Sequence, residues 1–259
     1  MIRLVAVTTL IVLSSCDAPA KVSEAEKLDA KDVVSASEFL TEETRVLQRD
    51  TFANPGYLWV DRGRTLFSEA SIAGPSCATC HEEGLTGVAA TYPAFDEKLG
   101  RVLNLEGRIN QCRETHQGEA PWDYESEELL STTAFVANQS LDAPISVDVT
   151  GPARATYEAG EAYFLTRRGQ FNLSCQQCHT ENWGKRLRGD TISQGHGNGF
   201  PAYRFEWESL GSLHRRLRDC DLGVRAEPLP YGDPLYVAVE LYLANRASGI
   251  AYESPAIRR

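Results

Sequence analysis

Two copies of a Cys-x-x-Cys-His pentapeptide carry the clearest chemistry in this sequence, CATCH at residues 77–81 and CQQCH at residues 175–179. Two thiols at this spacing can both form thioethers along one edge of a porphyrin, and the histidine that follows can bind the iron. A zinc site would need another compact ligand pair for each Cys-x-x-Cys, and a thioredoxin-like redox pair makes no use of the histidine. We therefore expect two covalent haem c groups. The attachment residues are Cys77, Cys80, Cys175 and Cys178, and the proximal iron ligands are His81 and His179.

The second axial ligand of each iron is commonly Met or His. The chain has one methionine, Met1, which lies in the N-terminal leader, so methionine ligation is excluded in the processed protein. The side chains that remain as candidates are His116, His196, His214, Cys112 and Cys220.

Two of the remaining cysteines have matching sequence contexts. RINQC ends at Cys112 after the first haem motif, and RLRDC ends at Cys220 after the second, so both read Arg, aliphatic, two polar residues, Cys. Equivalent positions suggest equivalent roles, and we expect each thiolate to bind one iron. Two alternatives stay open: a Cys112–Cys220 disulfide, which is usual in an oxidising compartment, and ligation by His116 or His196.

Positive charge gathers before Cys220. His214, Arg215, Arg216 and Arg218 precede it on the same short segment. Arginines near a thiolate favour its ionised form and can form a binding site for a dianion. Each charge-assisted hydrogen bond contributes about 1.5–3 kcal/mol, so two or three such donors would hold a small oxyanion. The alternative is that this run is a solvated helix face, which is the usual meaning of clustered charge.

The elements that position these residues are also duplicated. Gly63 and Phe67 precede the first motif, and Gly160 and Phe164 precede the second; in each pair, Phe follows Gly by four residues and shares its helix face. The Gly-to-Cys distance is 14 residues in the first copy and 15 in the second. This repeat predicts an all-α protein with two tandem cytochrome c-like domains.

The remaining segments complete this organisation. We expect the first cytochrome c domain over residues 51–140 and the second, with the active site, over residues 141–259. The stretch 138–151 lacks helical periodicity and contains a proline, so it is predicted to be the linker. The apolar segment 235–247 is predicted to be a closing helix. Residues 16–50 are expected to form a tether and then a helix over 35–49.

The N-terminus has the features of an export signal. Residues 4–13 are apolar and too few to cross a bilayer as a helix, which takes about 20 residues. LSSC, ending at Cys16, is typical of a bacterial lipobox, so residues 1–15 are predicted to be a signal peptide and Cys16 a lipidated N-terminus. The alternative is cleavage after the A-x-A pattern at residues 18–20, which would discard Cys16. Either route predicts a periplasmic protein.

Composition limits the partners of the chain. The formal net charge is −10, and 42% of the 259 residues are hydrophobic, which is typical of a globular protein. Affinity for nucleic acid comes mainly from Lys and Arg on phosphates. The acidic balance therefore argues against nucleic acid as a ligand, while a local arginine cluster still permits an anionic substrate.

Four stretches carry a resemblance to a known family: SQGHGNGFPAYR at 193–204, GSLHRRLRDC at 211–220, RAEP at 225–228 and ELYLANR at 240–246. With both haem motifs, they make residues 50–259 closely similar to SoxA, the family of dihaem cytochrome subunits in the SoxAX complex of bacterial sulfur oxidation. The matching segments are long and specific.

The resemblance implies an L-cysteine S-thiosulfotransferase that oxidatively couples thiosulfate to a cysteine of the carrier SoxYZ and passes electrons through haem. It implies the monohaem cytochrome SoxX as heterodimer partner. The reactive cysteine of the family corresponds to Cys220, its substrate-contacting arginine to Arg216, and the distal cysteine of the other haem to Cys112. Two other functions remain open: a thiosulfate dehydrogenase that forms tetrathionate, and an electron-transfer cytochrome without catalysis.

Overall fold

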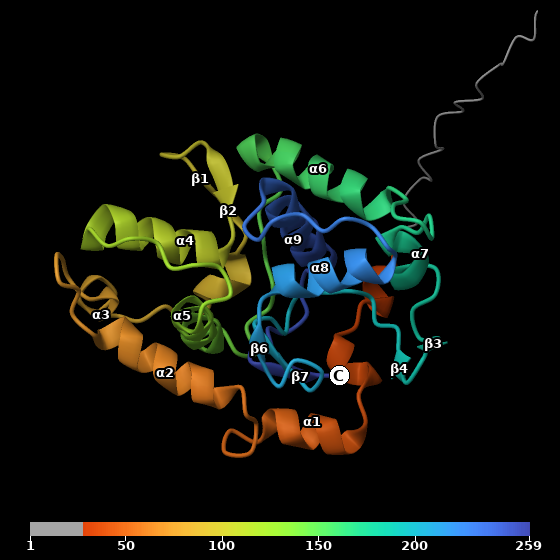
Figure 1. Ribbon diagram of the computed structural model, residues 1–259, viewed down its shortest axis with the longest axis horizontal. Helices are drawn as coiled ribbons and strands as arrows, with labels where there is room; N and C mark the ends of the chain where they lie inside the picture. Colours follow the sequence, from red (N-terminus) through yellow and green to blue (C-terminus); the bar gives the residue numbers. More distant parts are fainter. Residues whose placement is uncertain (1–27) are drawn as a thin grey trace, which may run out of the picture.

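The computed structural model describes residues 28–259 (Figure 1). The predicted signal peptide, the lipidated Cys16 and the alternative cleavage at residues 18–20 lie outside the described residues. Within residues 28–259, no helix has both the length and the apolar character needed to cross a membrane.

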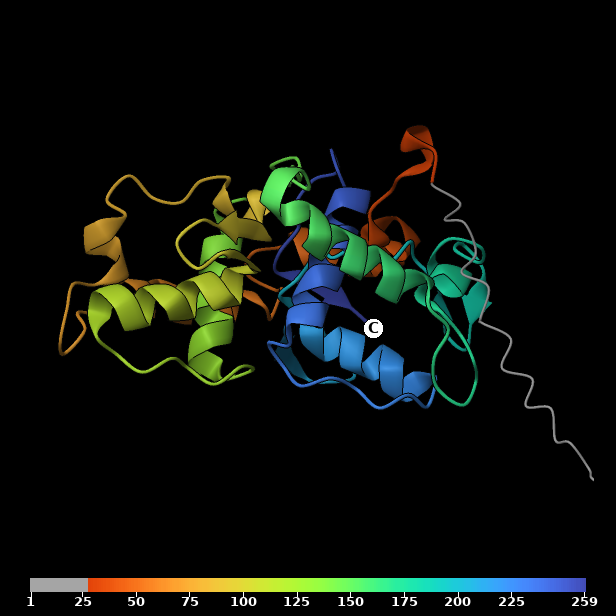
Figure 2. The same ribbon diagram turned by 90° about the horizontal axis from the view of Figure 1, so that it is seen from above.

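Two groups of helices lie side by side, as Figure 2 shows. Residues 51–140, here called the first half, form α2 (Tyr57–Ser68), α3 (Cys77–Cys80), α4 (Leu105–Cys112) and α5 (Glu127–Asn138). Residues 141–259, here called the second half, form α6 (Arg154–Leu165), α7 (Cys175–His179), α8 (Leu213–Gly223) and α9 (Pro234–Arg246). Short helical turns connect them: the 3₁₀ turns Val88–Thr91 and Gly151–Ala153 and the π-turn Arg113–Gln117.

The expectation of an all-α chain is confirmed only in part, because short strands accompany the helices. The strands are β1 (Ala94–Asp96), β2 (Arg101–Leu103), β3 (Arg186–Leu187), β4 (Asp190–Thr191), β5 (Ala202–Arg204), β6 (Ser209–Gly211) and β7 (Ala256–Arg258). β1–β2, β3–β4 and β5–β6 pair antiparallel, and β7 pairs parallel to β5. Loops that run between helices must satisfy their backbone hydrogen bonds, and pairing does so. Strands of two or three residues are too short to produce a recognisable alternation in the sequence.

The repeated Gly–Phe pattern has the same effect on packing in both halves. In α2, a Cβ on Gly63 would lie 1.9 Å from the backbone oxygen of Ser131 on α5; in α6, a Cβ on Gly160 would lie 2.0 Å from that of Ala238 on α9. Only glycine lets the two backbones approach this closely. Each half therefore rests on one helix pair that crosses at a glycine, and the phenylalanine one turn later is buried in both.

The closing helix is confirmed, since α9 spans Pro234–Arg246. The helix expected over 35–49 is instead broken. A 3₁₀ turn at Ala36–Phe39 ends before Thr41, whose side chain accepts a hydrogen bond from the Thr44 amide and starts α1 (Glu42–Arg49). A second N-cap inside the segment ends one helix and begins another.

The segment before residue 50 packs on the second half although it precedes the first. The Gln48 side chain accepts hydrogen bonds from the Ile257 amide (3.1 Å) and from Arg258 (2.7 Å) on β7, and the Gln194 side chain bonds the backbone of Val34 (2.9 Å). In Figure 1, the red-to-orange α1 accordingly lies beside β7. This end of the chain thereby becomes part of the support for the glycine-rich segment that precedes β5.

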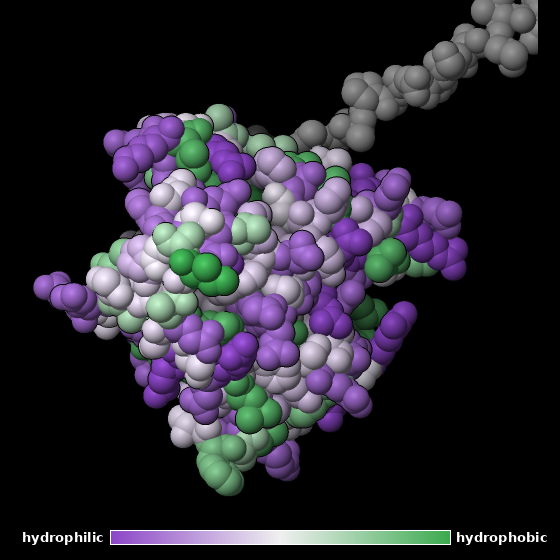
Figure 3. All heavy atoms as spheres, turned by 60° about the vertical axis from the view of Figure 1, so that its left-hand side comes forward, coloured by the Kyte–Doolittle hydropathy of each residue, from purple (hydrophilic) through white to green (hydrophobic). Residues whose placement is uncertain are grey.

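The surface is mainly polar on the side shown in Figure 3, where apolar side chains appear as separate patches among polar ones. Exposed apolar side chains of the described chain include Leu58, Ile72 and Leu99. Scattered apolar residues of this kind are normal on a surface in contact with water.

Candidate active site

The second haem motif forms a short, firmly capped helix. Ser174 is the N-cap of α7, and Gln177 at the third helical position accepts a hydrogen bond from the Ser174 amide (2.9 Å), which completes a capping box. α7 carries Cys175, Cys178 and His179, so the two thiols and the imidazole are fixed relative to one another.

The His179 ring has the surroundings of a metal-binding imidazole. Its Nδ1 lies 2.8 Å from the backbone oxygen of Ser193, which fixes the ring and leaves Nε2 free to bind iron. Burial lowers the pKa of His179 to about 4, so the imidazole is neutral at pH 7, as ligation requires. Gly195 packs against the ring: a Cβ there would lie 2.8 Å from His179 Cγ. The donor set and its cradle therefore fit a covalently attached c-type haem.

α8 brings the predicted reactive residues to the same place. Arg216 and Cys220 are four residues apart on α8 and so share one face. The Cys220 sulfur is close enough to Cys175 and Cys178 to act on both thiols electrostatically. Arg216 in turn acts on His179. The sequence-predicted residues of the second motif are thus brought together.

Arg216 is the arginine that remains available to a ligand. The negative charge of Cys220 raises the pKa of the half-buried Arg216 guanidinium above its ordinary value. Among residues 28–259, no side-chain hydrogen bond or ion pair engages this guanidinium. Because the guanidinium is only half-buried and its donors are unused, it can bind a small anion through charge-assisted hydrogen bonds.

The other two arginines of the cluster are engaged elsewhere, which corrects the expectation that two or three would bind an anion. Arg215 lies over the Trp207 ring at 4.4 Å and donates to Ser209 (3.1 Å). Arg218 lies over the Tyr231 ring at 4.6 Å and bonds a backbone oxygen of the following loop. Packing against aromatic rings removes both from the position of an anion ligand.

Asp221, next to Cys220, anchors the end of α8. The hydroxyls of Tyr163 (2.7 Å) and Tyr236 (2.6 Å) both donate to its Oδ2, and Arg168 lies 3.5 Å from its Oδ1. Asp221 is 3% exposed, so these bonds satisfy a buried carboxylate. Sequence reasoning missed this network because Tyr163 and Arg168 lie more than 50 residues before Asp221.

The first motif has the same parts in a more open setting. Ser76 caps α3, and Cys112, the last residue of α4, acts electrostatically on Cys77 and is itself acted on by Cys80. Burial raises the pKa of the Cys112 thiol. His81 is exposed, and its ring lies 6.2 Å from that of Phe67.

Arg108 occupies in the first half the place that Arg216 has in the second, four residues before the cysteine. Its guanidinium, however, contacts Asp96 (2.6 Å), Tyr92 (3.0 Å) and Gln111 (2.8 Å). These partners use its donors, so the first half lacks the free guanidinium that marks the second.

The structure also places the alternative ligands and the two cysteines of the alternative disulfide. None of the six cysteines within residues 28–259 forms a disulfide, so the Cys112–Cys220 bridge is not present. His196 lies near His179 and contacts the Gln194 side chain through Nε2 (3.0 Å), whereas the His116 side chain is exposed on the π-turn. His214 faces Glu240 (3.3 Å) and accepts a hydrogen bond from the backbone.

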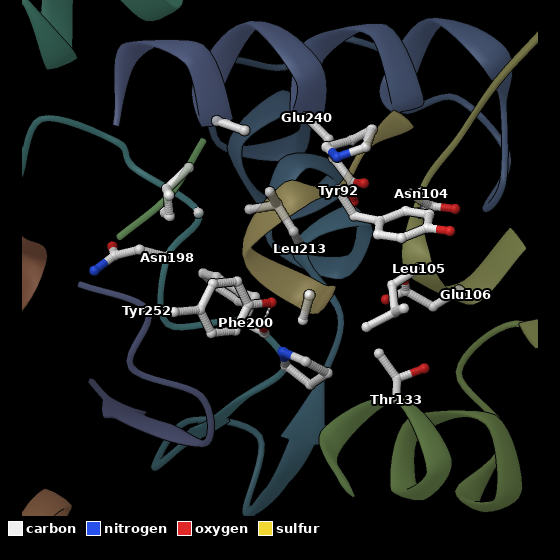
Figure 4. Close-up of a pocket in the computed structure, with 16 residues that line it drawn as sticks. Tyr92, Asn104, Leu105, Glu106, Thr133, Asn198, Phe200, Leu213, Glu240 and Tyr252 are labelled. Carbon is white, nitrogen blue, oxygen red and sulfur yellow. Dashed lines mark hydrogen bonds between the residues drawn. The ribbon is translucent and has the colours of Figure 1, made fainter. Parts of the chain in front are cut away.

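A cavity of about 60 Å³ lies between the two halves, away from the described cysteines. Figure 4 shows Glu106 and Glu240 on its wall. Burial raises the pKa of Glu106 to about 7, with Glu125 adding to the effect, and burial followed by the charge of Glu106 raises that of Glu240. These two acids are a feature that sequence reasoning missed, because nothing local distinguishes them from surface glutamates.

Comparison with known proteins agrees with this geometry. The SoxA/TsdA cytochrome c domain family matches residues 62–145. The curated L-cysteine S-thiosulfotransferase subunit SoxA of Rhodovulum sulfidophilum is 36% identical over 245 residues, covering 93% of this chain and 85% of that protein. The protein of the same name from Pseudaminobacter salicylatoxidans is 39% identical over 227 residues, covering 85% of this chain and 79% of that one.

A solved structure shares the fold. A chain in the crystal structure of SoxXA from P. pantotrophus is 34% identical and superposes with a TM-score of 0.84, covering 88% of this chain and 87% of that one. The chain therefore belongs to the SoxA family of cytochrome c proteins.

Proposed function

We propose that this chain is an L-cysteine S-thiosulfotransferase, which transfers thiosulfate oxidatively onto a cysteine of the carrier protein SoxYZ. The observation that carries the proposal is the free Arg216 guanidinium one helical turn before Cys220. A cationic group beside a thiol can hold a small dianion with its terminal sulfur near the thiol sulfur. The activity is the one named in the curated relatives.

We further propose that each half is a cytochrome c domain with one haem, over residues 51–140 and 141–259. The first haem would be held by Cys77, Cys80, His81 and Cys112, and the second by Cys175, Cys178, His179 and Cys220. The matched Gly63 and Gly160 crossings and the matched position of the two distal cysteines support this duplication. When bound, haem supplies a site that accepts electrons one at a time and passes them on.

The chain's own residues account for the sulfur chemistry. Arg216 binds the thiosulfate dianion and orients it. The Cys220 thiolate and the terminal sulfur of thiosulfate then form an S–S bond, and the two electrons that this oxidation releases pass one at a time to the partner cytochrome as the oxidant. An S-thiosulfonate is left on Cys220. A thiolate of the carrier then attacks the sulfur that is bonded to the Cys220 sulfur. The S–S bond to Cys220 breaks, the thiosulfonate group passes to the carrier, and the Cys220 thiolate is the leaving group. Atoms and charges balance, and the chain returns to its starting state.

The partners and compartment follow from the same assignment. We propose that SoxX, the monohaem cytochrome, forms the heterodimer with this chain, since the matched structure is named SoxXA. SoxYZ is the acceptor and thiosulfate the substrate. We place the protein in the periplasm and propose that a lipid on Cys16 anchors it to the membrane.

The deciding experiment compares Cys220→Ala and wild type, each purified with the partner cytochrome. Intact mass should show two haem additions on both, because the attachment cysteines are unchanged. Thiosulfate, carrier and an electron acceptor are then supplied, and carrier conjugation is followed by mass. Conjugation should disappear in Cys220→Ala.

Full conjugation in Cys220→Ala would contradict the assignment of the reactive thiol. Tetrathionate formed by the wild type without carrier would indicate a thiosulfate dehydrogenase instead. If the wild type only exchanges electrons, and neither product forms, the chain is an electron-transfer cytochrome. The same mass spectrum reports any lipid on Cys16.

A further inference from the structure

Glu125 belongs to the first half but reaches the helix that carries the proposed thiosulfate site. It directly precedes Ser126, the N-cap of α5, and its backbone has a φ of +66°, which is unusual for a residue other than glycine. Its side chain is 15% exposed, and Oε1 accepts a hydrogen bond from the Ser212 amide at 3.1 Å. A residue keeps such a backbone conformation only when the surrounding contacts fix it. Residues of this kind cluster at functional sites.

The bond from Ser212 completes a cap that α8 does not encode locally. Ser212 is the N-cap of α8, and its side chain accepts from the Arg215 amide at 3.2 Å. In a capping box, a Glu or Gln at the third helical position accepts from the N-cap amide. That position in α8 is Arg215, so the acceptor comes from Glu125, 87 residues earlier. In α7, by contrast, Gln177 fills this role locally.

The other carboxylate oxygen of Glu125 leads towards Cys220. Oε2 lies 3.9 Å from Nη1 of Arg215, and Arg215 packs over Trp207 at 4.4 Å. The Trp207 indole nitrogen donates to Asp219 at 3.0 Å, and Asp219 directly precedes Cys220. Contacts that begin at Glu125 therefore reach both the first turn of α8 and the turn that holds the cysteine.

We infer that Glu125 is a positioning residue for the anion site on α8. It supplies the missing cap from the first half and so sets the first turn, which carries Arg216. Through Arg215 and Trp207, it also restrains the turn that carries Cys220. The first half thus helps to build the site of the second half. The inference rests on the proposed function only for the identity of the anion.

The test compares two variants of similar side-chain length in the full chain with its haems and partner cytochrome. Glu125→Gln keeps an oxygen that can accept from the Ser212 amide, and Glu125→Met does not. Glu127→Met is the matched control. Glu127 is exposed on α5, and its carboxylate lies 3.8 Å from Arg62, which belongs to α2 and not to α8. Three quantities are measured: KM for thiosulfate, hydrogen exchange of amides 212–216, and the electron paramagnetic resonance signal of each ferric haem.

Loss of one cap acceptor should speed exchange of amides 212–216 about three- to tenfold in Glu125→Met and raise KM by a similar factor. The signal of the haem beside Cys220 should broaden, with that of the first haem unchanged. Glu125→Gln should keep exchange and KM at the wild-type values, because its oxygen still accepts from the Ser212 amide, and Glu127→Met should match the wild type in all three quantities. If Glu125 only stabilised the fold, the Met variant would not change the signal of one haem alone, and the Gln variant would not retain wild-type exchange and KM.

Glu125→Met that behaves like Glu127→Met in exchange and spectrum would overturn the inference. If Glu125→Met takes up no haem, Glu125→Gln decides: wild-type exchange and KM support the role of the acceptor, and altered values refute it. Failure of the proposed function would give a different result from failure of this inference. The wild type itself would then form no carrier conjugate, while hydrogen exchange and the electron paramagnetic resonance signals would still report on the cap of α8.

Discussion

Arg216 stands one helical turn before Cys220 on α8, and its guanidinium makes no side-chain hydrogen bond or ion pair within residues 28–259. Its counterpart in the first half, Arg108, is held by Asp96 at 2.6 Å. The two halves therefore differ in one chemical respect, which is whether a free guanidinium lies four residues before the cysteine.

Removal of the free guanidinium should weaken substrate binding. We expect Arg216→Gln to raise KM for thiosulfate about 10- to 100-fold, since a hydrogen bond to a charged group contributes about 1.5–3 kcal/mol. Steady-state conjugation of the carrier at varied thiosulfate measures it. Arg225→Gln is the control, because Arg225 is exposed and contacts Gln170 (3.2 Å). Equal KM values in the two variants would exclude Arg216 as the anion ligand.

The two glycine crossings should be intolerant of a methyl group. Gly63→Ala and Gly160→Ala would each place a Cβ about 2 Å from a backbone oxygen, so one helix of each pair must move. Overpacking of this kind costs about 1–3 kcal/mol or more, and we expect a clear fall in Tm for both. Gly189→Ala, where a Cβ meets nothing within 4 Å, should leave Tm unchanged. A Tm for either helix variant that matches Gly189→Ala would contradict the crossing.

The buried acids between the halves should make stability depend on pH. The pKa of Glu106 is raised from 4.5 to about 7, so the folded chain binds its proton more tightly than the unfolded chain does. Its contribution to stability is present below about pH 4.5 and is lost as pH rises through about 7. We therefore expect Glu106→Gln, which has no proton to lose, to gain stability over the wild type as pH rises across this range.

A pKa shift of this size corresponds to roughly 3 kcal/mol at most in the free energy of unfolding. Urea unfolding at several pH values between 4 and 8 measures the difference between variant and wild type. Glu240→Gln should act in the same direction, because burial raises the pKa of Glu240 as well. A difference that stays constant over this pH range would show that neither acid retains its proton in the folded chain.

Several features could be predicted from the sequence because they depend on residues close together in the chain. The haem motifs, the helices built on Gly63 and Gly160, and the closing helix are encoded by spacing within one or two turns. The helix expected over 35–49 was wrong in its continuity, since Thr41 provides a second N-cap. The strands were missed because each is too short to produce a pattern.

The sequence by itself was enough to predict the ligand chemistry: paired thiols beside a histidine, no methionine after Met1, and a cysteine four residues after an arginine in each half. Only the tertiary structure decided which arginine of the cluster is free. Arg215 and Arg218 are turned to Trp207 and Tyr231, and α8 is capped by Glu125. The physical reason is that these partners lie in other elements, so packing, and not local spacing, selects the guanidinium that remains beside Cys220.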